Sequence, residues 1–237
     1  MVLINPGPMI KITIRLLAIS LLLFFTKAGF SQHSSVRLGL KVAPCISWMN
    51  PNEKTYTYNG ASAGVSFGFI SEFHFSEHYA ITSGFNFSFL SGNLQFPHVQ
   101  SPDTGLLDRK YNFRYLEIPL MVKMKTKDYG NFSFFGQIGF GTGFNLRTQV
   151  KDNFMTQNHG TLTDKKNLTT GEVCFMRESI IVGLGTEYKI DESISLIVGF
   201  SYSNSLNNVL LGKNTKDNSL KNRSSLNYVE LDIGVLF

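Results

Sequence analysis

Large apolar residues alternate with small or polar residues over long stretches of this sequence, and this two-residue period restricts the fold more than any other feature. In residues 193–203 the even positions carry Ile, Leu, Val, Phe and Tyr, whereas the odd positions carry mostly Ser and Gly. Residues 79–90 and 131–144 repeat the pattern with Phe on one face. Because side chains point alternately to the two sides of a β-strand, the pattern predicts strands with one apolar face and one face of small or polar side chains.

The same period over the whole chain predicts an all-β domain of eight strands. No linker or change in composition divides them, and charged residues make up only 16% of the chain, against a usual value of about 25%. We therefore expect a single domain over residues 32–237. The strands are expected at residues 36–48, 60–75, 79–90, 111–126, 131–146, 175–190, 193–206 and 226–237.

The connections between these strands alternate strictly between short and long. The segments "SEH", "KDYG" and "DE" have hairpin length, whereas the other four connections are long and polar. This alternation is typical of an antiparallel up-and-down β-barrel with short periplasmic turns and long extracellular loops. The longest connection, residues 147–174, has few apolar residues, and we expect it to be the main external contact surface.

The polar rows decide which side of the barrel faces lipid. A soluble barrel of the lipocalin type turns its apolar rows inward and its polar rows to water. Here the polar rows are mostly Gly, Ser, Ala, Thr and Asn, whereas a water-exposed exterior is normally rich in charged residues. We therefore expect a transmembrane β-barrel with apolar rows toward the lipid of the cell outer membrane and polar rows in a narrow lumen.

Charged residues of both signs fall on the predicted lumen face. Isolated charges would be costly in a lumen that excludes bulk water, but paired charges stabilise one another. We interpret these residues as a structural ion-pair network, with a catalytic role for the acids as the weaker alternative. The network comprises Arg37, Lys41, Glu72, Glu117, Lys123, Lys125, Glu187, Lys189, Glu230 and Asp232.

The N-terminal residues resemble a secretory signal. Lys11 and Arg15 precede the apolar stretch 16–25, and small residues follow. We expect residues 1–31 to be a signal peptide cleaved after Ser31, with Met9 as an alternative start. Its three basic residues leave with it, so the net charge falls from +5 to +2, which gives no support for nucleic acid as a partner.

The last ten residues, "YVELDIGVLF", form the eighth predicted strand, which must pair with the first to close the barrel. The terminal Phe237 resembles the signal by which the barrel assembly machinery recognises bacterial outer-membrane proteins. Cys45 and Cys174 lie on strands that are not predicted neighbours. We therefore favour two free thiols over a disulfide, although the sequence does not decide between them.

The segment "YLEIPLMVK", residues 115–123, carries a family resemblance. Its first six residues, Tyr115, Leu116, Glu117, Ile118, Pro119 and Leu120, resemble a motif of the PorT-like outer-membrane β-barrel family of Bacteroidota. The resemblance implies an outer-membrane barrel, and one branch of that family takes part in type IX protein secretion. Pro119 cannot donate a ladder hydrogen bond, so we expect a bulge or bend there.

Three functions are compatible with these features. The first is a non-enzymatic barrel whose long loops bind a partner or support an envelope assembly. The second is a component of type IX secretion, with envelope or secretion proteins as partners. The third is an outer-membrane lipid-modifying enzyme, for which His98 and His159 in the long loops are the candidate residues. No motif for a cofactor or a metal accompanies them.

Overall fold

The computed structural model describes residues 36–100, 103–156, 160–168, 171–212 and 222–237, so the expected signal peptide lies outside the described residues. No helix in the described part of the chain has the length and hydrophobicity to span a membrane. The described strands are β1 (Val36–Pro51), β2 (Thr57–Tyr58), β3 (Ser62–Ser76), β4 (Tyr79–Gln100), β5 (Asp103–Lys125), β6 (Phe132–Thr156), β7 (Gly160–Asn167), β8 (Met176–Lys189), β9 (Ser195–Ser205) and β10 (Ser224–Leu236).

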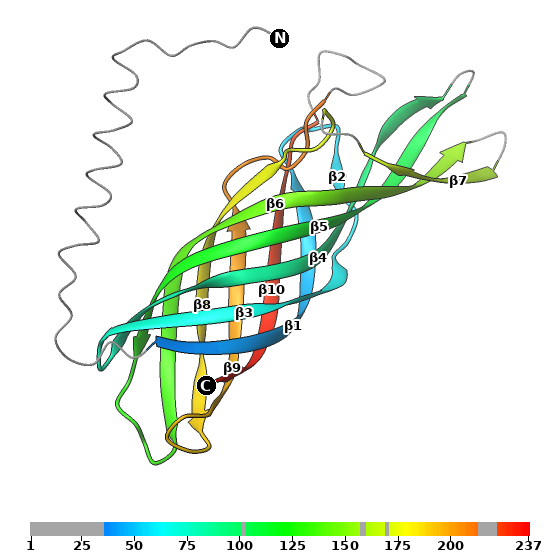
Figure 1. The fold of residues 1–237 in the computed structure, drawn as a ribbon. Coiled ribbons are helices and arrows are strands. Elements are labelled where there is room, and N and C mark those ends of the chain that lie inside the picture. The colour runs from blue at the N-terminus through cyan, green and yellow to red at the C-terminus, as the bar shows by residue number, and fades with distance from the viewer. Residues whose placement is uncertain (1–35, 101–102, 157–159, 169–170, 213–221) are drawn as a thin grey trace, which may run out of the picture. The chain divides into compact units, whose positions relative to one another are not determined.

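Eight of these strands form a closed antiparallel ring (Figure 1). The order around the ring is β1, β3, β4, β5, β6, β8, β9 and β10, and β10 pairs with β1 to close it. Two backbone hydrogen bonds between Leu38 and Phe237 continue this last ladder to the final residue. The predicted eight-stranded up-and-down barrel is confirmed, and closure leaves no unpaired sheet edge in the ring.

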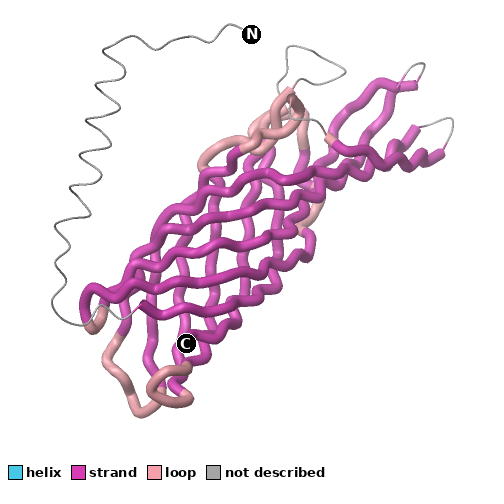
Figure 2. The backbone as a smooth tube through the Cα atoms, in the orientation of Figure 1, coloured by secondary structure: helices cyan, strands magenta, loops and turns pink. Residues whose placement is uncertain are grey.

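Part of the chain that was predicted as loops is instead strand. β4 and β5 run as one long hairpin, paired from Tyr79 with Met124 out to Gln100 with Asp103. β6 continues to Thr156 and pairs there with β7. These segments project beyond the ring at its long-loop end (Figures 1 and 2). We call residues 91–100, 103–114, 147–156 and 160–167 the outer extension.

In the strands that form the ring, the apolar rows face outward, as the composition of the polar rows predicted. Leu40, Phe140 and Leu184 are each at least 60% exposed to the surroundings of the protein. Trp48 and Tyr202 stack on the outer surface near the long-loop end, with ring centroids 6.2 Å apart. Amphipathic aromatic rings at this level are typical of the interfacial girdle of a membrane barrel.

The two faces of the sheet exchange their polarity where the strands leave the ring. Along β4 the outward residues change from Phe87 and Phe89 to Asn93 and Gln95, while the inward residues change from small polar ones to Leu94 and Phe96. The alternation keeps its phase, so only the residue types change. An outer face that turns from apolar to polar marks the level at which the sheet passes from lipid into water.

The β4–β5 ladder is interrupted opposite Pro119 without a change of register. Ser83 pairs with Leu120 and Asn86 with Glu117, and the two residue pairs between them are missing. The Ser83 hydroxyl donates to the Pro119 carbonyl at 2.9 Å. Gly84 has a φ of +148°, and a Cβ there would lie 2.0 Å from a backbone oxygen of β3, so glycine is required. The bulge between β5 and β6 lies instead at Arg114 and Tyr115.

Candidate functional site

The barrel interior brings nine of the ten predicted lumen charges together, in three groups along its axis. Each group contains at least one carboxylate and one cation in direct contact. The groups follow from strand periodicity, because a charge on every second residue of neighbouring strands lies on the same face.

The first group lies toward the short turns and is centred on Glu187 of β8. Its carboxylate contacts Arg37, and the Nζ atoms of Lys125 and Lys123 lie 3.3 and 3.6 Å from it. Lys123 also donates to Glu72, and its ammonium lies 4.3 Å from the centre of the Phe135 ring. Glu187 and Lys123 are almost fully buried, so each charge depends on the others for stabilisation.

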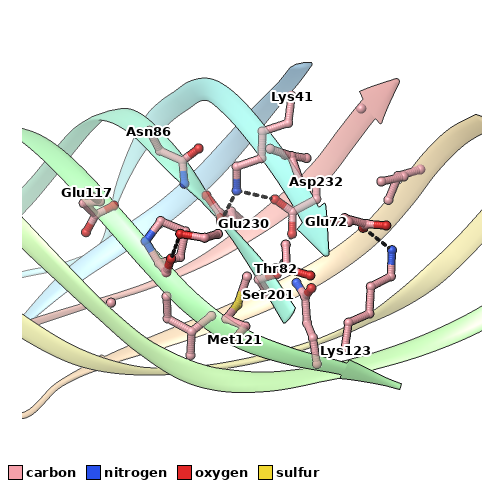
Figure 3. Close-up of a pocket in the computed structure, with 18 of the residues that line it drawn as sticks. Lys41, Glu72, Thr82, Asn86, Glu117, Met121, Lys123, Ser201, Glu230 and Asp232 are labelled. Carbon is pink, nitrogen blue, oxygen red and sulfur yellow. Dashed lines mark hydrogen bonds and ion pairs between the residues drawn. The ribbon is translucent and has the colours of Figure 1, made fainter. Parts of the chain in front are cut away.

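The second group joins Lys41 of β1 to two acids of β10 (Figure 3). The Lys41 ammonium donates to Glu230 at 2.9 Å and to Asp232 at 2.8 Å. The hydroxyls of Ser66 and Ser201 donate to the same two carboxylates. One cation between two acids leaves an excess negative charge, which these two hydroxyls help to stabilise.

The third group pairs Glu117 with Arg177. The Arg177 guanidinium donates to Glu117 at 2.8 Å and to the Leu226 carbonyl at 2.9 Å. Glu117 also accepts hydrogen bonds from the hydroxyls of Ser88 and Tyr228. Arg177 has no exposed surface, lies over the Tyr228 ring at 5.1 Å and also donates to the Ser203 hydroxyl. This group is therefore a bonded hub that joins β4, β5, β8, β9 and β10.

Arg177 was absent from the predicted network although its signal was present in the sequence. It stands ten residues before Glu187 on β8, with the same parity, and Val182 and Leu184 occupy the outward positions between them. Extending the lumen parity of Glu187 to the start of the strand would have placed Arg177 inside.

Lys189 has the predicted parity but lies at the rim of the barrel, outside the three groups. β8 ends at this residue, and its side chain is 42% exposed where it pairs with Asp128 of the β5–β6 turn. The end of a strand projects beyond the rim, where water competes for the charge.

Little free space remains between these groups. The cavity lined by Lys41, Glu117, Lys123 and Tyr228 has a volume of about 50 Å³, room for only a few water molecules. Beyond the Glu117 group, toward the long loops, the interior holds a buried cluster of mainly apolar side chains. We call this buried cluster the outer cap; its almost fully buried members include Met49, Leu90, Leu94, Leu107, Phe113 and Leu226.

The remaining candidate residues are dispersed. Cys45 is buried on β1, Cys174 is half-buried, and both are free thiols. His98 lies in the outer extension between the Phe96 and Phe154 rings, 6.5 and 5.6 Å away. Burial and the nearby Arg109 lower the pKa of the His98 imidazole below its usual value. In the described segments no group of three His, Cys, Asp or Glu residues is placed to hold a metal ion.

Comparison with protein families assigns the barrel. A family model described as outer membrane protein beta-barrel domain matches residues 30–171. The chain belongs to this family. Its location is the cell outer membrane, in agreement with the apolar outer face of the ring, and membrane lipid is its environment. By the general rule for such barrels, the short turns are periplasmic and the outer extension is extracellular. No curated protein matches the chain.

Solved structures with a similar fold are also outer-membrane barrels. Neisserial surface protein A is 12% identical, with a TM-score of 0.45 over 86% of this chain and 98% of its own. OprG from Pseudomonas aeruginosa is 10% identical, with a TM-score of 0.44 over 86% and 97%. Ail, the attachment invasion locus protein of Yersinia pestis, is 10% identical, with a TM-score of 0.40 over 87% and 100%.

Proposed function

We propose that this protein is a non-enzymatic outer-membrane barrel that acts through its outer extension rather than by conducting solutes. The observation that carries the proposal is the outer cap, which fills the lumen with apolar side chains on the extracellular side of the ion-pair groups. An eight-stranded barrel has an interior only wide enough for side chains. With the lumen filled, the part of the molecule that reaches a partner outside the cell is the sheet formed by β4, β5, β6 and β7.

The bonding of the interior acids supports a structural role for them. Glu117, Glu230 and Asp232 each accept hydrogen bonds from a cation and at least one hydroxyl. A general acid or base needs a free path to substrate, whereas these groups are engaged with one another. The enzyme alternative would use His98 or His159, and His159 lies outside the described residues. Loss of lipid turnover on His98→Ala would favour that alternative.

A second candidate function is a PorT-like role in type IX secretion. The observation in its favour is the resemblance of residues 115–120 to that family of Bacteroidota. The structure also gives the segment a local role, because Glu117 is the acceptor of the Arg177 hub and Tyr115 belongs to the outer cap. Deletion of the gene in the native host decides between the two, since a secretion component is required for export of other proteins and a partner-binding barrel is not.

A photocrosslinker at Met155 tests the outer extension as the contact surface. Met155 is 47% exposed near the tip of β6, whereas Tyr129 is 69% exposed on a periplasmic turn and serves as the matched control. In intact cells, we expect Met155 to crosslink to an envelope or extracellular protein that the control position does not capture. Identical crosslinked products from both positions would count against the extension as a specific binding surface.

We also propose that Phe237 acts in recognition by the barrel assembly machinery. Its backbone pairs with Leu38, and its side chain faces outward with 54% of its surface exposed. This position at the seam between β10 and β1 makes the side chain available to another protein before the ring closes.

A further inference from the structure

Three lysines lie side by side across the outer face of the outer extension. Lys110 of β5 is the register partner of Lys151 of β6, which in turn is the partner of Lys165 of β7. All three side chains are exposed. Neighbouring strands are about 4.8 Å apart, and like charges directly opposite one another destabilise a sheet. The three adjacent lysines therefore lower the stability of the folded protein.

The acids of the outer extension do not neutralise this row. Within the described residues, no ion pair joins Lys110, Lys151 or Lys165 to a carboxylate. On the opposite face of the same sheet, Arg109 donates two hydrogen bonds of 2.6 Å to Asp152. Arg109 and Asp152 are thus paired on the inner face, whereas the three lysines stand without an ion pair on the outer face, where an external anion can reach them.

The basic face begins directly above the lipid level. Leu116 and Phe144 form the last apolar outward pair of β5 and β6 before the bulge, and the next outward pair beyond it is Arg114 with Arg147. The lysine row follows four residues further along β5, about 13 Å away at the usual rise of a strand. Between the two rows lies a row of amides.

That row of amides completes a polar hollow. Asn112, Gln149 and Asn167 are register partners. Together with the three lysines they line a hollow of about 430 Å³, within the usual size range of ligand sites. Amide and ammonium groups donate hydrogen bonds, and phosphate oxygens accept them.

We propose that this basic face binds the phosphate groups of an anionic glycolipid of the surrounding outer leaflet. Continuity with the lipid-facing rows selects a membrane lipid over a soluble polyanion, because the arginine pair lies at the height where a lipid headgroup begins. Basic residues next to a membrane surface bind anionic headgroups additively. The inference does not depend on a protein partner at the tip of the extension, which lies further from the membrane.

The test compares lipids that differ only in phosphate. The protein is immobilised in neutral detergent and incubated with fluorescent lipid A that carries both phosphates, or with lipid A from which both have been removed. We expect tighter binding of the phosphorylated form, weakened by salt. The variant Lys110→Gln/Lys151→Gln/Lys165→Gln should lose about fivefold in affinity per lysine, roughly a hundredfold in total.

A matched control variant removes the same charge from exposed residues outside the basic face. Lys54→Gln/Lys127→Gln/Arg223→Gln should bind phosphorylated lipid A as the unchanged protein does. Equal binding of the two lipid A forms by the unchanged protein would overturn the proposal whether or not the lysine variant folds. An equal loss of affinity for phosphorylated lipid A in both variants would also overturn it. So would displacement of lipid A by free pyrophosphate at the same phosphate concentration, because that would indicate a soluble phosphate ligand.

Discussion

Replacing Arg177 with methionine should lower the free energy of unfolding by about 3–5 kcal/mol, the usual cost of removing one partner of a buried ion pair. The loss arises because Glu117 keeps its charge but loses its cation inside the barrel. The Leu226 carbonyl loses its donor as well. The effect is measured as the midpoint of urea unfolding in detergent. The folded fraction is read from the gel shift between the folded and the heated barrel.

Two further variants separate the buried charge from the loss of a side chain. Adding Glu117→Gln to Arg177→Met should recover part of the lost stability, because an amide costs less to bury unpaired than a carboxylate. Arg114→Met, an exposed arginine on the outer face, should change stability by no more than about 0.5 kcal/mol. An Arg177→Met barrel as stable as the unchanged protein would show that the hub is not a stabilising feature.

Replacing Phe237 with serine should remove most of the protein from the outer membrane while changing the stability of a refolded barrel much less. Full burial of a Phe side chain contributes about 1.5–3 kcal/mol, and this one remains half exposed. A role in recognition during insertion depends directly on the aromatic ring. The measurement compares membrane levels in cells with the urea midpoint of purified, refolded protein.

Val235→Ser is the matched control for this change. Val235 faces outward on the same strand and is 38% exposed, but it is not the terminal residue. We expect it to reach the membrane at nearly normal levels. Equal membrane levels of Phe237→Ser and the unchanged protein would contradict the insertion role.

The ring was predictable because apolar and polar residues alternate along each of its strands, with the apolar residues mostly on the outer face. Phe85, Phe87 and Phe89 of β4 show it, and the strict alternation of short and long links gave the topology. The outer extension was missed because it keeps the period and exchanges the polarity, so "SGNLQF" reads as a polar loop. The phase still holds there, since Leu94 and Phe96 continue the inward row of Ser88.

The interior charges were predictable as a set but not as individual pairs. Parity along each strand placed Lys41 and Glu230 on the same face, whereas their contact depends on the register between β1 and β10. A sequence without strand register does not specify which lysine reaches which acid. Lys189 shows the other limit, because parity does not indicate where the rim of the barrel lies.

Cysteine labelling in intact cells tests most directly whether the barrel is lipid-facing within the membrane and closed by an apolar cap outside it. With Cys45 and Cys174 replaced by serine, single cysteines are placed at Phe87, Leu94 and Lys110. We expect a water-soluble maleimide to label Lys110→Cys alone, because Phe87 faces lipid and Leu94 is enclosed in the outer cap. All three should react after unfolding in hot detergent. Rapid labelling of Leu94→Cys in intact cells would reveal a water-filled lumen and contradict the apolar cap. Labelling of Phe87→Cys would place that face in water and contradict the lipid-facing barrel.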